Sequence, residues 1–148
     1  MTAISYASTA SSDQVMWSKV LALHTHVERQ LTQALQRKHG IGLSEFRAME
    51  CLAQAADSEL RMQDLADKIG LGQSSVTRLV GRLDAAGLAF RDLCPDDKRG
   101  VYAVITDEGR ERYAAARSTY DEVLSSALNT VGAVPELART VQALRSGV

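Results

Sequence analysis

The stretch that most constrains the fold of this chain is residues 63–86, where two helical patterns meet at a very short turn. Ala66 is small at the point where two steeply crossing helices must approach each other. Gly70 follows one helical turn later, where glycine permits backbone angles that other residues rarely adopt. Apolar side chains at matching positions can hold both helices on one core: Leu65, Ile69, Leu71, Val76 and Leu79. The pattern predicts a helix-turn-helix.

The second helix of the pair, residues 73–86, has one apolar side and one cationic side. At about 100° per residue, Ser74, Arg78 and Gly81 point away from the apolar stripe, with Thr77 and Arg82 on the flanks. The stripe itself consists of Val76, Leu79, Val80 and Leu83. One side of the helix should therefore be buried and the other exposed.

The exposed side suits the major groove of DNA. Arginine can donate two hydrogen bonds to guanine, and the short hydroxyl groups of Ser and Thr can reach bases or phosphates. We therefore predict that Ser74, Thr77, Arg78 and Arg82 contact DNA. The alternative is a corner between two helices whose arginines are solvated and have no role in binding.

A short β-rich segment follows this pair of helices. Residues 88–93 and 101–106 favour strands, and the polar residues between them favour a turn, so the pattern predicts a β-hairpin. Lys98 and Arg99 lie at its tip, where they could enter a minor groove, whose negative potential attracts arginine. Asp97 could pair with an arginine and brace the tip. A plain charged loop is the alternative.

Helical patterns flank this central part on the N-terminal side. A periodic apolar pattern predicts a helix over residues 13–37, ended by Gly40 and Gly42. Ser44 is expected to be the N-cap of the next helix. Residues 1–12 are expected to form a flexible tail.

Two more helices are predicted after the hairpin. Thr106 is expected to cap the first, and Pro135 to begin the last. Long helices at both ends carry more apolar surface than one small domain can cover, which favours pairing with a second copy. We therefore expect a homodimer, with residues 13–40 and 107–148 as dimerisation helices; folding back onto the same chain is the alternative. The expected fold class is mainly α with a small β-hairpin.

Residues 43–109 resemble the MarR family of bacterial regulators. The resemblance rests on LSEFRAMECL, on LADKIGLGQSSVTRLVGRLDAAGL, on RDLCPDDKRGVYAVIT with its Asp97-x-Arg99 motif, and on ITDEG. It implies one domain over residues 13–148, with a winged helix-turn-helix lobe at residues 43–106. It also implies a homodimer that binds double-stranded DNA at a pseudo-palindromic operator, usually as a repressor, with the recognition helix in the major groove and the wing in the minor groove.

The same resemblance implies residue roles. Ser74, Ser75, Thr77 and Arg78 would belong to the DNA-reading helix, and Arg99 to the wing. Gln73, the first residue of that helix, is counted with the predicted interface, as is Lys98.

Members of this family often respond to small phenolic or aromatic ligands, bound between the dimer helices and the DNA-binding lobe. Trp17, His24 and Phe46 could line such a pocket. An aromatic residue at helical spacing is more often part of the core, so both interpretations stay open.

Composition narrows the other possibilities. The net charge of −1 and the pI near 6.3 are unusual for a DNA-binding domain and leave a winged-helix protein-interaction module as a rival. We find no phosphate-binding glycine loop, nucleophile motif or metal-binding array, so an enzyme, a cofactor and a metal site are not expected.

The chain is expected to be cytoplasmic. It begins without a secretory signal, and no apolar run approaches the ~20 residues of a membrane span. Cys51 and Cys94 lack the spacing of a metal site or a disulfide framework. Cys51 is expected to be a buried small hydrophobe, whereas redox activity of Cys94 is an open question.

Overall fold

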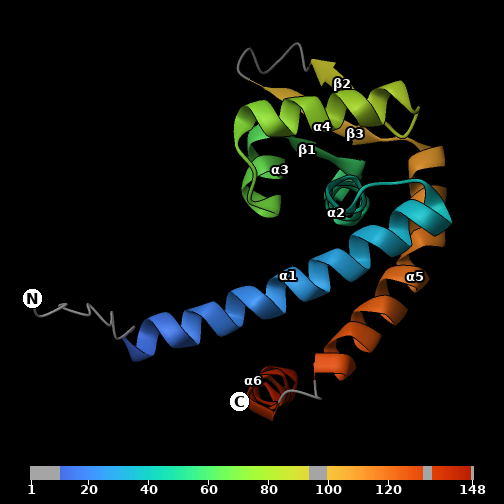
Figure 1. The fold of residues 1–148 in the computed structure, drawn as a ribbon. Helices are drawn as coiled ribbons and strands as arrows, with labels where there is room; N and C mark the ends of the chain where they lie inside the picture. The colour runs from blue at the N-terminus through green and yellow to red at the C-terminus, as the bar shows by residue number, and fades with distance from the viewer. Residues whose placement is uncertain (1–10, 94–99, 132–134, 148) are drawn as a thin grey trace, which may run out of the picture. The chain divides into compact units, whose positions relative to one another are not determined.

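The computed structural model describes residues 11–93, 100–131 and 135–147 (Figure 1). The chain divides into two compact units, which we describe separately: residues 31–123, and residues 1–30 together with 124–148. The elements in chain order are α1 (Ser12–His39), α2 (Leu43–Gln54), a 3-10 turn (Ala56–Ser58), β1 (Glu59–Arg61), α3 (Met62–Ile69), α4 (Gln73–Ala85), β2 (Ala89–Leu93), β3 (Val101–Ile105), α5 (Asp107–Val131) and α6 (Pro135–Ser146). This confirms the predicted fold class, which is mainly helical with a small antiparallel sheet.

The sheet has three strands in the order β1-β3-β2, all antiparallel (Figure 1). The predicted hairpin is confirmed: Ala89 pairs with Ile105 at one end of the ladder, and Leu93 pairs with Val101 at the other. Strand β1, which pairs with β3 from Glu59 to Arg61, was not predicted. It is only three residues long, and such a run is too short to show the alternation by which strands are recognised.

The core of the unit at residues 31–123 forms where α2, α3 and α4 meet. The fully buried large side chains are Leu31, Leu35, Ile41, Phe46, Met49, Leu52, Leu65, Val76, Leu79, Val80 and Leu83. The predicted apolar plug is thus confirmed at Leu65, Val76 and Leu79, whereas Ile69 and Leu71 are only half-buried.

The turn between α3 and α4 follows the sequence prediction. Gly70 is left-handed, with φ of 71°, and Ala66 is buried at the helix crossing. The N–H of Leu71 donates to the carbonyl oxygen of Ala66 at 3.0 Å, which closes the turn. The two helices are therefore joined with almost no spare chain.

The predicted start of α2 needs a correction. Gly42 is its N-cap, so Ser44 is not a cap and Gly42 does not end α1; Gly40 does, at φ of 64°. The N–H of Gly42 donates to Oε2 of Glu45 at 3.0 Å. Because Glu45 satisfies the N-cap N–H from within the first turn, the helix can begin before Ser44.

The end of α1 is fastened to α5 by polar contacts. Nε2 of His39 lies 2.8 Å from Oγ1 of Thr119, a buried hydroxyl group. Nη1 of Arg112 donates to the carbonyl oxygen of His39 at 3.0 Å. These bonds fix the last turn of α1 within the unit at residues 31–123.

The start of α5 is tied to the turn between α4 and β2. Oγ1 of Thr106 donates to the carbonyl oxygen of Gly87 at 2.7 Å and accepts the N–H of Gly109 at 3.0 Å, which confirms the predicted cap. A methyl group on Gly109 would collide with the carbonyl oxygen of Leu88 and come within 2.8 Å of Cγ1 of Ile105. Glycine is therefore required here by close packing, not by an unusual φ.

In the unit formed by residues 1–30 and 124–148, Ala127, Val131 and Val141 are buried. Several large apolar side chains of the same unit are exposed in the single chain: Val15, Met16, Trp17, Leu21 and Leu144. Among the described helices, none is both long enough and apolar enough to span a membrane.

Replacing Gly109 by Ala should lower the free energy of unfolding by about 1–3 kcal/mol, because the added methyl group overpacks the junction of α5 with β2 and β3. Urea denaturation followed by circular dichroism measures this loss. Glu111→Ala, at an exposed position of the same helix, is the control and should change stability by less than about 0.5 kcal/mol. Equal stability of the two variants would show that the junction relaxes freely.

Candidate nucleic-acid interface

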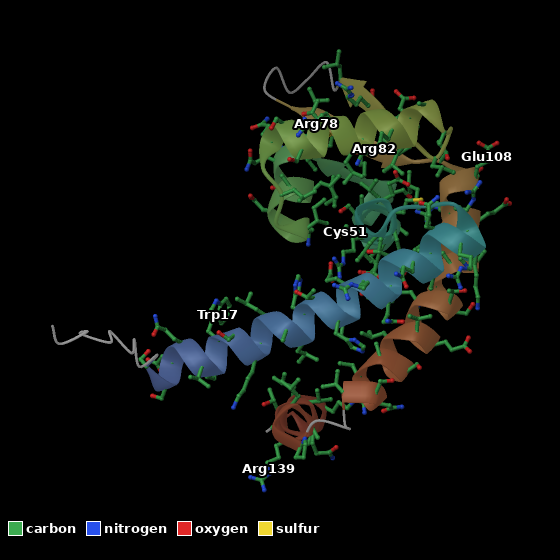
Figure 2. All side chains as sticks on the ribbon, in the orientation of Figure 1. Trp17, Cys51, Arg78, Arg82, Glu108 and Arg139 are labelled. Atoms are coloured by element: carbon green, nitrogen blue, oxygen red, sulfur yellow. The ribbon has the colours of Figure 1, made fainter. Side chains whose placement is uncertain are left out.

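Helix α4 is held in one orientation by its buried stripe. The side chains of Val76, Leu79 and Val80 are completely inaccessible and Leu83 is 1% exposed. The predicted orientation is confirmed, since Ser74 and Arg78 on the opposite side are exposed. Figure 2 shows Arg78 on α4. The helix cannot roll to hide its polar side without exposing these four apolar side chains.

The predicted DNA-contacting residues of α4 differ in their surroundings. Gln73, Ser74, Arg78 and Arg82 are exposed, whereas Ser75 and Thr77 are half-buried. The hydroxyl group of Thr77 donates to the carbonyl oxygen of Gln73 at 2.9 Å. Because the hydroxyl hydrogen of Thr77 is already donated within the helix, its oxygen can only accept a hydrogen bond from a ligand.

Arg82 is engaged by another helix. Its Nε lies 3.5 Å from Oε1 of Glu45, the residue whose other oxygen accepts the N–H of Gly42. The side chain of Arg82 is 58% exposed, and that of Glu45 is 22% exposed. Glu45 thus connects the first turn of α2 to the flank of α4. The sequence prediction missed this connection because the two residues lie far apart in the chain.

The N-terminus of α4 borders a cavity of about 220 Å³. Its lining comes from three places: Gln73 at the start of α4, residues 61–63 at the start of α3, and Gly100 with Val101 at the start of β3. Nε of Arg61 donates to the hydroxyl group of Tyr102 at 3.1 Å, and its guanidinium carbon lies 5.7 Å from the centre of that ring. The first turn of α4 and the tip end of the hairpin, where β3 begins, therefore border the same hollow.

Strand β2 brings a further arginine to α4 that the sequence prediction did not include. Nη2 of Arg91 lies 3.7 Å from the point where a side chain at Gly81 would begin. Strand alternation could have indicated this position, because Arg91 and the buried Ala89 lie on the same face of β2.

Three predicted wing residues, Asp97, Lys98 and Arg99, lie outside the described residues, as does Cys94. Their assignments to the minor groove and to bracing of the tip stay predictions. The strands that precede and follow them are described, and β2 packs against α4.

The residues predicted to line a ligand pocket fall in both units. Phe46 is completely buried, with its ring stacked 4.5 Å from that of Tyr120 and 5.4 Å from that of Tyr113. Trp17 is 57% exposed, and His24 is exposed with Nε2 3.8 Å from Oε1 of Glu28. Phe46 is therefore part of the hydrophobic core. A ligand-binding role for Trp17, His24 and Phe46 stays a prediction.

Cys51 is only half-buried, so the prediction of a buried cysteine was wrong. Burial, followed by the charge of Glu50, raises the pKa of its thiol. The thiolate is the reactive form, so this cysteine is a poor nucleophile at neutral pH.

Among the described residues, no three His, Cys, Asp or Glu side chains are grouped so that they could hold a metal ion.

A profile of the MarR family matches residues 39–100. Over these residues the chain is similar to the MarR family. The match covers α2, the two helices of the helix-turn-helix and β2, and it ends just before β3. The motifs on which the resemblance rests lie largely within the matched residues.

Individual transcription regulators are also similar to this chain. The HTH-type transcriptional regulator MhqR of Bacillus subtilis is 38% identical over 72 residues, which are 49% of this chain and 48% of MhqR. The chain thus matches about half the length of this relative. Sco3205, a MarR family transcriptional regulator of Streptomyces coelicolor solved in complex with DNA, is 26% identical, with a TM-score of 0.75 over 90% of this chain and 88% of Sco3205.

CouR of Rhodococcus jostii RHA1, solved with bound p-coumaroyl-CoA, has the same fold, with a TM-score of 0.70 over 93% of this chain and 95% of CouR at 23% identity. MhqR and Sco3205 are transcription regulators. The comparisons thus agree with the prediction of a MarR-type regulator rather than an enzyme.

Replacing Glu45 by Ala should lower the free energy of unfolding by about 1 kcal/mol, because the N–H of Gly42 loses its acceptor. Arg82→Ala should cost less than about 0.5 kcal/mol, since an ion pair exposed on one side contributes little. Urea denaturation of both variants measures the difference. A larger loss for Arg82→Ala than for Glu45→Ala would contradict the capping role of Glu45.

Proposed function

We propose that this protein is a DNA-binding transcription regulator that places α4 in the major groove of its operator. The observation that carries the proposal is the two-sided character of α4. Four buried side chains fix one side, and the other side presents Ser74 and Arg78 to solvent. A helix of this kind, held rigidly on a small core, is the common device for reading base edges.

The comparison with Sco3205 supports this proposal. That regulator was solved in complex with DNA, and its fold matches most of this chain. In the proposed complex, Arg78 donates to a guanine or a phosphate, while Gln73, Ser74 and Ser75 lie at the N-terminal end of the helix, nearest the groove floor. Thr77 contributes an acceptor.

We further propose that the protein acts as a homodimer on a pseudo-palindromic site. Two copies related by two-fold symmetry would present their recognition helices about 34 Å apart, one turn of DNA. The exposed apolar side chains of α1, among them Trp17 and Leu21, support pairing with a second copy, since such a cluster on a single chain indicates an interaction site.

The wing and the regulatory output complete the proposal. Lys98 and Arg99 would enter the minor groove beside the recognition helix, with Asp97 bracing the tip. Bound near a promoter, the dimer would act as a repressor in the cytoplasm. The complex of CouR with p-coumaroyl-CoA supports release by a small aromatic ligand, with Trp17, His24 and Phe46 as the residues to test first.

Replacing Arg78 by Ala should weaken binding to the operator by roughly five- to 150-fold, since one well-placed arginine contributes about 1–3 kcal/mol. The operator is first selected from a random duplex library with the wild-type protein, and affinity is measured by fluorescence anisotropy over a range of salt concentrations. Arg117→Ala removes the same charge from α5, where Arg117 lies 4.0 Å from Asp121, and should bind like the wild type. Wild-type affinity of the Arg78→Ala protein would refute the proposed reading helix.

Replacing Trp17 by Glu should shift the protein from dimer towards monomer, because it places a charge in the proposed apolar interface. Sedimentation velocity at micromolar concentrations measures the shift, and circular dichroism checks that the helices remain. Gln54→Glu adds the same charge at an exposed position of α2 and should leave the dimer intact. A wild-type protein that sediments as a monomer would show that the homodimer proposal is wrong.

A further inference from the structure

We propose that Glu45 of α2 is a positioning residue for DNA binding, which holds the guanidinium group of Arg82 in the orientation in which it contacts the operator. The inference rests on the proposed function, because Arg82 is one of the residues predicted to contact DNA. Glu45 acts through Arg82 and does not itself touch DNA. It lies outside the helix-turn-helix, at the start of the preceding helix.

The carboxylate of Glu45 is oriented by its own helix. Glu45 stands in the first turn of α2, next to the completely buried Phe46. Its Oε2 accepts the N–H of Gly42 at 3.0 Å, a bond that is local to the start of α2. The side chain of Glu45 is 22% exposed. The carboxylate is therefore held in place without help from α4.

Arg82 is the mobile partner of the pair. Its backbone is fixed by the buried stripe of α4, but its long side chain is 58% exposed. Holding such a side chain in one place removes much of its rotamer freedom. Oε1 of Glu45 lies 3.5 Å from Nε of Arg82 and restricts that freedom before DNA arrives. Less freedom is then left to be lost when Arg82 binds DNA.

The contact with Glu45 uses the part of the guanidinium group nearest the stem. Arginine has five N–H donors, of which Nε carries one and the two terminal nitrogens carry four. An acceptor at Nε and a second acceptor at the terminal nitrogens can therefore be bound together. Arg82 follows Arg78 by four residues on α4 (Figure 2), so the two lie next to each other on the helix surface. Glu45 is thus placed to orient the second of two neighbouring arginines.

The two hydrogen-bonded oxygens explain why this position holds a glutamate. One oxygen serves the N–H of Gly42 and the other serves Arg82. A glutamine of the same shape has one oxygen, and its NH₂ group can only donate. Glutamine could therefore keep the cap of α2 or the contact with Arg82, but not both.

Charge repulsion alone predicts the opposite effect of removing this carboxylate. A negative charge near the phosphates repels them, so neutralising Glu45 should strengthen DNA binding if repulsion is all that matters. If Glu45 positions Arg82, neutralising it should weaken binding instead. The sign of the change distinguishes the two cases.

Glu45→Gln should weaken binding to the selected operator by roughly two- to tenfold, because one long side chain is left to be ordered on binding. Fluorescence anisotropy measures this at about 0.15 M salt, where exposed charges more than about 8 Å apart are largely screened. Glu111→Gln removes the same charge from an exposed position of α5 and should bind like the wild type. Thermal unfolding monitors the fold of each variant.

The decisive measurement repeats Glu45→Gln in two other backgrounds. With Arg82→Ala no further weakening is expected, because a positioning residue acts only through the side chain that it positions. With Arg78→Ala the loss should persist in full.

Three results would overturn the role of Glu45. Unchanged or tighter binding by Glu45→Gln would show that Arg82 needs no positioning. An equal loss with and without Arg82 would show that Glu45 acts on the fold or on α4 as a whole. If the wild-type protein selects no duplex at all, the proposed function fails instead, and the two failures are thereby distinguished.

Discussion

The burial of one stripe of α4 is the constraint on which the rest of the proposed site depends. Val76, Leu79, Val80 and Leu83 are inaccessible or nearly so, and each buried aliphatic side chain is worth roughly 1.5–3 kcal/mol. That energy fixes the roll of the helix about its own axis. The polar side is exposed as a consequence, and no separate interaction is needed to hold Arg78 out in solvent. A rigidly oriented helix can then read DNA without the entropic cost of ordering a loop.

Much of this architecture could be predicted from the sequence, because it depends on local patterns. The period of the apolar residues indicates α4 and its buried side, and Gly70 indicates the tight turn before it. The hairpin strands follow from their β-forming residues and the turn between them. Thr106 also caps α5 as expected, since N-capping requires only a short polar side chain next to the first turn.

Most of the features that the sequence did not predict depend on residues far apart in the chain. Strand β1 exists because Glu59–Arg61 pair with residues 102–104 of β3, and three residues alone carry no strand pattern. The start of α2 is a local exception: Ser44 is a residue type typical of N-caps, but Glu45 accepts the N–H of Gly42 and the helix begins before Ser44. The contacts of Glu45 with Arg82, and of Arg91 with Gly81, join separate elements and become evident only when the chain is folded.

The near-neutral net charge of the chain is compatible with DNA binding, because only charges close to the DNA phosphates interact with them strongly. At 0.1 M salt, charges farther apart than about 10 Å are largely screened from each other, so the charges close to the phosphates decide affinity. Next to α4, Glu45 is half-buried and bound to Arg82 and to the N–H of Gly42, and the first acidic residue of α4 itself is Asp84, near its C-terminal end. The carboxylate of Glu45 is thus paired within the protein, where it holds Arg82 in place. It therefore repels the phosphates less than an unpaired carboxylate would. A net charge near zero therefore describes the whole chain, whereas residues 73–82 of the recognition helix carry Arg78 and Arg82 and no acidic residue.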